Sequence, residues 1–410
     1  MRDIPPEIIA EIISYIDPED LHTLSRCCFV SRAVLPVARR ALYDNITLHF
    51  VPSFSATLSN AVLPPVLSPR SYALEHTLLL HPHLAIIPHG VKLWDDQRRV
   101  ETPSSSYNHP AHTIRAMWAT LPNLDKLVIM DATVSFPTLA TMVQGLVANT
   151  SDSKDASSAE VLPSGKHLRY LSIFEGGMYD YGAPLRSLLR SLPHLERLLV
   201  GEIFLPETED HTRPTFSLSH LVVRSDSSKG RFLPFLTSSS HDSLISAALP
   251  VDSSKYDLSP FTRLKTVSFT FRCWNPTRKD KETKKSLKKI LAAVATAPAT
   301  LKRVEIIENW QQNGISGPPQ VLTHSGLLEN LPSTLESVNL HGLQIDVSYL
   351  LRFLRDAPTG WKVLGLECRF VGEDGEGSND EETLSKVEQA CVERGIAVSF
   401  TGMTRAIRTP

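Results

Sequence analysis

The sequence predicts an α/β protein in which a small bundle of three helices precedes an irregular solenoid of strand-and-helix repeats. Two observations lead to this fold class. Apolar residues recur at helical spacing in three segments before residue 50. A Leu-x-x-Leu-x-Leu pattern then returns along much of the remaining chain, with stretches of helical spacing between its copies.

The composition is that of an ordinary globular protein, with 42% hydrophobic and 21% charged side chains among 410 residues. The formal net charge of -2 gives no general attraction to nucleic acid or to anionic membranes. No window of about 18 apolar residues occurs, so we expect a soluble protein inside the cell, cytoplasmic or nuclear. Five cysteines without a CxxC pair favour a reducing compartment over a disulfide framework.

The first predicted helix has an unusually wide apolar face. Pro5 and Pro6 fit its first turn, and isoleucines follow at positions 8, 9, 12, 13 and 16. At 100° per residue these five side chains cover an arc of about 140°. A helix that packs against one core needs a stripe of roughly 100°. We therefore expect part of this face to serve a second surface.

Two more short helices complete the N-terminal bundle. Asp17 is expected to cap the second helix, with Pro18 at its first position. The third is expected from Ser31 to about Leu42, with Pro36 in its first turn. Burial gives about 1.5–3 kcal/mol per large aliphatic side chain, whereas ordering costs roughly 1–2 kcal/mol per residue. So small a bundle should dock on another protein, or it simply caps the domain that follows.

The N-terminal segment resembles the motif of a known family. The stretches that carry the resemblance are Ile4-Pro5-Pro6-Glu7-Ile8-Ile9, then Ile12-Ile13, Asp20-Leu21 with Leu24, Cys27-Cys28-Phe29-Val30-Ser31-Arg32 and Leu42-Tyr43. In this order they resemble the F-box motif of the fungal type. One position departs from it, because Val34 stands where members of this family commonly carry a tryptophan.

The resemblance implies a role in a ubiquitin ligase. The N-terminal helices would bind a Skp-type adaptor and, through it, a cullin, while the repeats would present a concave surface to a protein substrate. The chemistry of ubiquitin transfer would belong to other subunits, and this chain would act by proximity. Carried over by motif position, the adaptor contacts are Ile4, Pro5, Pro6, Ile8, Ile9, Ile12, Leu21, Leu24 and Val30.

A repeated unit follows the bundle. Residues 121–129 and 192–200 agree nearly residue for residue, and their last three apolar positions alternate as in a short strand. Helical spacing at 185–190 and 349–354 lies between copies. This pattern is typical of a degenerate leucine-rich-repeat solenoid, which we favour over a doubly wound α/β domain. Weaker copies occupy 167–173, 217–223, 263–269, 300–306, 334–340 and 361–366.

Polar segments interrupt the repeats. Residues 151–164 and 225–254 are rich in Ser, Asp and Ala and are predicted to be mobile surface loops, and 372–380 an acidic glycine loop. A helix capped by Gly395 and a closing strand at 396–400 are expected at the end. The predicted domains are a helical domain at 1–48, a linker with first irregular repeats at 49–115, a leucine-rich-repeat-like domain at 116–402 and a tail at 403–410.

Other candidate sites have simpler explanations. The lysine-rich run 278–289 could be a nuclear import signal or a phosphate-binding patch, but Leu287, Ile290 and Val294 make most of its lysines the solvated face of a helix. The histidines near residue 83 and the pair Cys27-Cys28 lack a zinc ligand set. We expect no catalytic residues, cofactor or metal. A non-ligase interaction scaffold and a nucleic-acid-associated nuclear protein stay open as alternatives.

Overall fold

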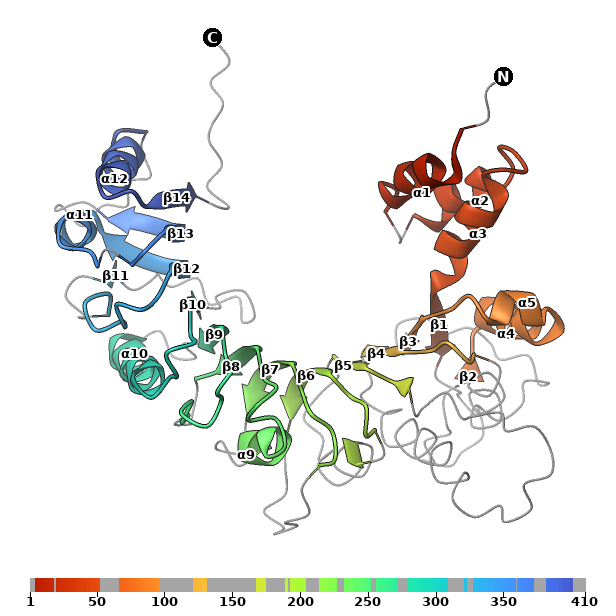
Figure 1. Ribbon diagram of the computed structural model, residues 1–410, viewed down its shortest axis with the longest axis horizontal. Coiled ribbons are helices and arrows are strands. Elements are labelled where there is room, and N and C mark those ends of the chain that lie inside the picture. Colours follow the sequence, from red (N-terminus) through yellow and green to blue (C-terminus); the bar gives the residue numbers. More distant parts are fainter. Residues whose placement is uncertain are drawn as a thin grey trace, which may run out of the picture. The chain divides into compact units, whose positions relative to one another are not determined.

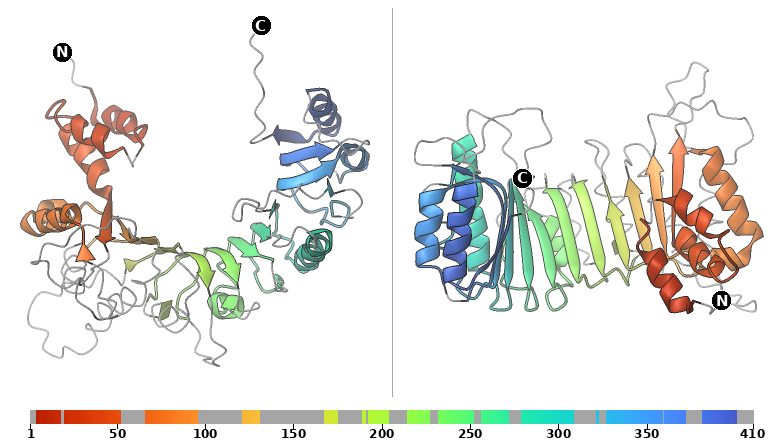
Figure 2. Two further views of the ribbon diagram at one scale, coloured as in Figure 1. Left: turned by 180° about the vertical axis from the view of Figure 1, so that it is seen from behind. Right: turned by 90° about the horizontal axis from the view of Figure 1, so that it is seen from above.

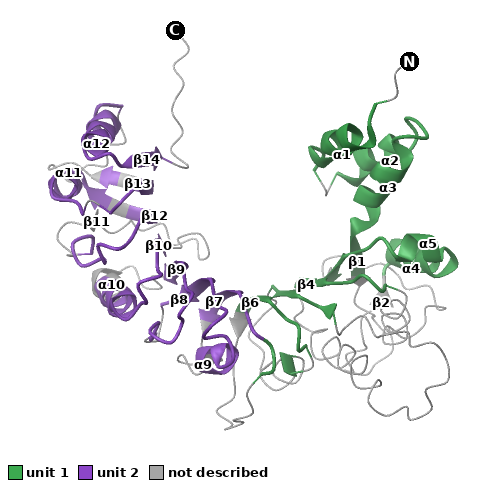
Figure 3. Ribbon diagram, in the orientation of Figure 1, with its two compact units in different colours: residues 1–208, 214–216 green, residues 209–213, 217–410 purple. Residues whose placement is uncertain are grey.

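The protein divides into two compact units of similar size. In the computed structural model the described residues are 4–17, 20–51, 66–95, 121–130, 167–174, 189–190, 192–203, 214–226, 232–251, 256–271, 279–308, 321–322, 327–358, 360–371 and 381–400. Unit 1 comprises residues 1–208 and 214–216, and unit 2 comprises residues 209–213 and 217–410 (Figure 3). Each unit contains helices and a run of parallel strands.

Unit 1 begins with the predicted three-helix bundle, formed by α1 (Pro6–Ser14), α2 (Leu21–Cys27) and α3 (Leu35–Asp44). Its core consists of Ile9, Ile13, Leu24 and Ala38, and partly buried side chains pack around them. Proline lies in the first turn of α1 and of α3, as predicted, because the missing N–H has no helical partner there.

The start of α2 differs from the prediction. Asp17 is not the cap: its carbonyl accepts from the Asp20 N–H at 2.9 Å in a turn, and Asp20 itself caps the helix. The Asp20 carboxylate accepts from Thr23 N at 3.0 Å, and hydrogen bonds from Thr23 lower the pKa of Asp20. The third helix also starts later than Ser31, because the Ser31 hydroxyl accepts from Val34 N and the chain turns first.

The strands of unit 1 follow the bundle without a break. In space they run β2 (Val66–Leu67), β1 (Asn45–Val51), β3 (Gly90–Asp95), β4 (Lys126–Met130), β5 (Tyr170–Ile173) and β6 (Arg197–Ile203). All neighbouring pairs with a described register are parallel except β1 with β2. Helices α4 (Pro69–Leu80) and α5 (Pro82–Ala85) precede β3, and the Ser71 hydroxyl accepts from His49 N at 2.7 Å, which ties α4 to β1.

Unit 2 contains parallel strands in strictly sequential order. They are β7 (His220–Asp226), β8 (Ser246–Pro250), β9 (Thr266–Phe271), β10 (Arg303–Glu308), β12 (Ser337–Asp346), β13 (Val363–Val371) and β14 (Ala397–Phe400), while the short β11 (Val321–Leu322) pairs with β12 alone. The helices are α9 (Phe232–Thr237), α10 (Lys279–Ala295), α11 (Val347–Arg355) and α12 (Glu381–Glu393), and they lie on one face of these strands (Figures 1 and 2).

This topology distinguishes the two predicted folds. A doubly wound domain reverses its strand order at a switch point and carries helices on both faces. The described part of unit 2 has neither feature. The predicted leucine-rich-repeat-like architecture is therefore confirmed.

The predicted repeats occupy equivalent places. Each of the eight predicted copies contains a strand, from β4 to β13. Val267, Val304, Val338 and Leu364 lie in register on neighbouring strands and have no exposed surface. Before most of these strands, one carbonyl accepts two N–H groups of the next repeat; that of Lys265, for example, accepts from residues 302 and 303 at 2.9 and 3.0 Å.

One predicted loop is wrong. Residues 225–254 contain α9 and β8 instead of a mobile loop. The repeat there reads Leu244-x-x-Ala247-x-Leu249, and Ala247 occupies the place of the second leucine with 3% of its surface exposed. The small side chain hid the pattern, and the surrounding serines resembled a linker.

The C-terminal end agrees with the sequence. Gly395 ends the last helical segment with φ of 68°, and β14 pairs with β13 in parallel. Helix α11 is capped by the Asp346 carboxylate, which accepts from Tyr349 N at 2.9 Å. The predicted loops at 151–164 and 372–380, most of the predicted helix at 185–190 and the predicted tail at 403–410 lie outside the described residues.

Candidate protein-binding surface

Helix α1 carries two apolar faces with different environments. Ile9 and Ile13 pack into the bundle core and each is 5% exposed. Ile8 and Ile12 are 46% and 55% exposed. The expectation that part of the wide isoleucine face remains free is therefore confirmed. Exposed apolar surface of this kind marks a site of contact with another protein.

The residues implied as adaptor contacts fall into two groups. Ile9 and Leu24 lie in the core, in one cluster with Ala38 of α3. The structure therefore places seven of the nine side chains in contact with solvent and two inside the bundle. The exposed residues are Ile4, Pro5, Pro6, Ile8, Ile12, Leu21 and Val30.

Two exposed aromatic residues were missed in the sequence. Tyr15 and Phe29 are among the most exposed large apolar side chains of the described chain, with 81% and 87% of their surface accessible. Tyr15 follows Ile8 by seven residues and so lies on the same face of α1, a relation that helical spacing could have revealed. Phe29 lies in the turn after α2, where no periodicity marks it.

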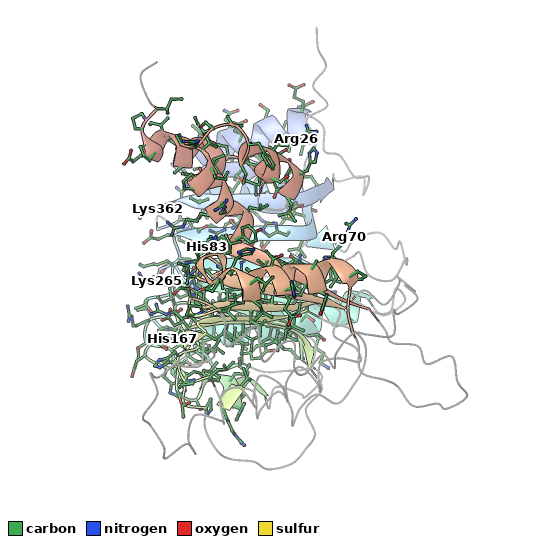
Figure 4. The ribbon with its side chains drawn as sticks, turned by 90° about the vertical axis from the view of Figure 1, so that its right-hand side faces the viewer. Arg26, Arg70, His83, His167, Lys265 and Lys362 are labelled. Carbon is green, nitrogen blue, oxygen red and sulfur yellow. The ribbon has the colours of Figure 1, made fainter. Side chains whose placement is uncertain are left out.

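Charged side chains are exposed on the same helices and turns. Glu7 and Glu11 on α1 are exposed, as are Arg26 at the end of α2 and Arg32 in the next turn. Arg26 extends outward from the helical bundle (Figure 4). Apolar and charged side chains exposed on the same segment fit the composition of an interface between proteins. We refer to Ile4, Ile8, Ile12, Tyr15, Leu21, Phe29 and Val30 as the isoleucine face.

The remaining candidates have structural roles. Lys284, Lys285 and Lys288 are exposed on α10 while Leu287 and Ile290 are buried, which confirms that the lysines form a solvated face. No group of three histidine, cysteine, aspartate or glutamate side chains in the described part of the chain is arranged to hold a metal ion.

The cysteines also have structural surroundings. Cys27 and Cys28 are partly buried and pack against the helical core, as expected. Burial raises the pKa of the Cys368 thiol to about 12 and that of Cys391 to about 11. Both thiols are therefore protonated at neutral pH and are poor nucleophiles.

Comparison with protein families identifies the N-terminal segment. Residues 1–33 match the model of the F-box domain. The protein therefore carries an F-box domain, which includes α1, α2 and the isoleucine face. No curated protein sequence matches the chain. None of the helices in the described residues is long and apolar enough to cross a membrane.

Several solved structures have a similar backbone. The TLR13 chain of a TLR13–ssRNA13 complex is 14% identical at a TM-score of 0.31; the match covers 71% of this chain and 31% of that one. The structure of the Rad7–Elc1 complex from yeast gives 11% identity, a TM-score of 0.39 and 88% coverage of each chain. LegL7, a leucine-rich-repeat-containing protein of Legionella pneumophila, is 11% identical with a TM-score of 0.33, and the match covers 78% of this chain and 86% of that one.

Proposed function

We propose that this protein is the substrate-recognition subunit of a Skp–cullin–F-box ubiquitin ligase. The F-box domain binds a Skp-type adaptor, which joins the chain to a cullin, and the repeats bind a protein substrate. The protein acts in the cytoplasm or nucleus, where it brings the substrate to a transfer enzyme carried by other subunits. The observation that carries the proposal is the exposed isoleucine face on a segment that matches the F-box domain.

The division of α1 into two faces supports this function physically. Each aliphatic side chain of the isoleucine face gains about 1.5–3 kcal/mol when a partner covers it. Ile9 and Leu24 contribute indirectly, because their packing fixes the angle between the helices that present the exposed residues. Ile4, Pro5, Pro6, Ile8, Ile12, Leu21 and Val30 are the proposed direct contacts.

The double substitution Ile8→Glu with Ile12→Glu tests the proposal. A carboxylate buried in an apolar interface costs several kcal/mol, so two of them should abolish binding to the adaptor. The measurement is copurification of the full chain with a Skp-type adaptor. Because both side chains are exposed in the free protein, the helical content seen by circular dichroism should not change.

A matched control separates the face from the helix. Ala10→Glu with Ser14→Glu places two glutamates at the same spacing on α1, on positions that are exposed but lie on the other side from Ile8. The control should copurify with the adaptor as the unchanged chain does. Copurification of the Ile8 and Ile12 variant at the same yield would contradict the proposal.

A non-ligase interaction scaffold is the second candidate, and one contact favours it. Helix α3 leads directly into β1, and the Asp44 carbonyl at its end accepts from His89 N at 2.9 Å. The bundle is thus joined to the repeats, as expected if its helices cap the solenoid. Removal of the helices, described in the Discussion, distinguishes the two functions.

A further inference from the structure

A row of charged side chains lies just before the strands of unit 2. Lys302, Glu336 and Lys362 occupy equivalent positions before β10, β12 and β13. The Glu336 carboxylate lies 3.4 Å from Lys302 Nζ and 2.8 Å from Lys362 Nζ. The hydrogen bond from Lys362 is the main cause that lowers the pKa of Glu336. Charges alternate along this part of the row, as expected for neighbouring strands.

The alternation fails at β9. Thr266 pairs with Arg303, so Lys265 lies opposite Lys302 and places two ammonium groups on adjacent strands. Arg263 adds a third cation two residues before Lys265. Arg263, Lys265, Lys302 and the neighbouring Arg303 are all exposed. Like charges directly opposite each other destabilise a sheet.

The carboxylates described on neighbouring elements do not neutralise Arg263 and Lys265. Among the described residues, none lies within ion-pair distance of Arg263 or Lys265. Glu305, on β10, faces His341 Nε2 at 2.8 Å instead. Asp242 accepts from the Thr262 hydroxyl at 2.9 Å.

The described partner of Arg303 is neutral. Its Nη2 lies 2.5 Å from the side-chain amide of Asn339, whose oxygen accepts. The four cations Arg263, Lys265, Lys302 and Arg303, here named the basic patch, therefore share one described carboxylate, that of Glu336. The chain as a whole has a net charge of -2, so this concentration is local.

We propose that the basic patch binds an acidic segment of the protein substrate, rich in aspartate and glutamate. The identification of that partner as the substrate rests on the proposed function. Carboxylates of the segment would supply the counter-charges that the described residues lack, and the two guanidinium groups offer paired N–H donors to them. Natural proteins break local rules, such as charge alternation, chiefly at functional sites.

The position of the patch suits a protein partner. Lys265 and Lys362 extend on the same side of unit 2 (Figure 4). The outward positions of β9 next to the patch are Thr266, Ser268 and Thr270, which are small and leave the cations accessible. No aromatic ring accompanies the cations at the outward positions of β9 and β10, so stacking of nucleic-acid bases has no support there.

The test measures binding of a fluorescein-labelled octaglutamate peptide to the full chain by fluorescence anisotropy. Arg263→Glu with Lys265→Glu should weaken binding by about tenfold or more, because attraction becomes repulsion. Lys284→Glu with Lys285→Glu makes the same change of charge on the exposed face of α10 and should alter binding by less than about twofold. Binding to the unchanged chain should weaken as salt is added.

Stability provides a second readout. Lys265→Glu places a carboxylate opposite Lys302 and restores the alternation of charge along the row. Its thermal unfolding midpoint should equal or exceed that of the unchanged chain. Loss of peptide binding together with undiminished stability cannot come from misfolding and would support a binding role.

Four outcomes would overturn the inference. Octaglutamate could fail to bind the unchanged chain, or the α10 control could lose as much binding as the variant of the basic patch. The chain could also bind an oligothymidylate of the same length equally tightly, or bind a phosphoserine peptide but not octaglutamate. Adaptor copurification is measured on the same variants. A variant that keeps the adaptor and the peptide argues against the basic patch while the proposed function stands. Loss of the adaptor by the Ile8 and Ile12 variant is a separate result.

Discussion

Glu75 shows how one residue can tie the stability of a fold to pH. It lies on α4 between Ser71 and Leu78, which are both buried, and is itself 5% exposed. Burial raises the pKa of Glu75 from its ordinary value of 4.5 to about 7. The folded state thus keeps a proton that the unfolded chain loses between these two values.

The consequence is a loss of stability as the pH rises. Below pH 4.5 both states are protonated and Glu75 costs nothing; between pH 4.5 and about 7 unfolding is increasingly favoured by release of the proton, and above that the penalty is constant because both states are ionised. Glu75→Gln removes this term and should stabilise the protein by up to about 3 kcal/mol at pH 8, with little effect at pH 5. Thermal unfolding midpoints of both proteins at the two pH values measure the effect. An equal difference in unfolding midpoint at the two pH values would show that the carboxyl group of Glu75 is solvated in the folded protein.

At the scale of a single element, α1 shows what helical spacing can and cannot predict. The spacing of its isoleucines predicts an apolar face too wide for one core. It does not say which side chains turn inward, because that depends on α2 and α3. The structure assigns Ile9 and Ile13 to the core and Ile8 and Ile12 to the surface.

The junction between α12 and β14 depends on one glycine. Gly395 has φ of 68°, and a Cβ added there would meet no atom within 4 Å. Gly395→Ala should therefore cost only the backbone strain of the left-handed conformation, about 1–2 kcal/mol. Gly395→Asn should cost less, because asparagine tolerates this conformation. Urea unfolding of the three proteins gives the order; equal stability of all three would mean that the turn can rearrange.

At the scale of the whole molecule, the two candidate functions make opposite predictions for removal of the F-box helices. The core of the bundle is formed by residues 9–38, whereas Ile46 and Leu48 of β1 are buried against the sheet. A chain that starts at residue 45 should therefore remain folded and monodisperse if the helices are an adaptor-binding module. Size-exclusion chromatography and circular dichroism provide the measurement.

A second truncation serves as the control. A chain that starts at residue 52 also lacks β1, which exposes Val91 and Leu93 of β3, and it should aggregate. Aggregation of both truncated chains would favour the capping scaffold. The domain boundary predicted at residue 48 falls within β1, which begins at Asn45. The predicted domain boundaries therefore remain a proposal, and the two truncated chains test this one.

Much of the fold could be predicted because it is encoded locally. The helical spacing of the first fifty residues and the repeated Leu-x-x-Leu-x-Leu pattern each lie within a dozen residues. Strand β8 was not predicted because Ala247 replaces a leucine of the repeat. Strands β1 and β3 were not predicted because no Leu-x-x-Leu precedes them. Spacing predicted that part of the apolar face of the first helix stays free, but it did not predict the exposure of Phe29, which lies in a turn.

By itself, the sequence determined the repeated strand-and-helix pattern, the F-box resemblance and the surplus of apolar surface on the first helix, all of which depend on neighbouring residues. Only the tertiary structure decided which isoleucines remain exposed, that Asn45 pairs with Gly90, and that Lys265 lies opposite Lys302. The exposure of the isoleucines depends on the packing of α1 with the other helices of the bundle. The two strand pairings join residues about forty positions apart. They arise from the register of strands, and register is set by the packing of the whole sheet, not by any local pattern.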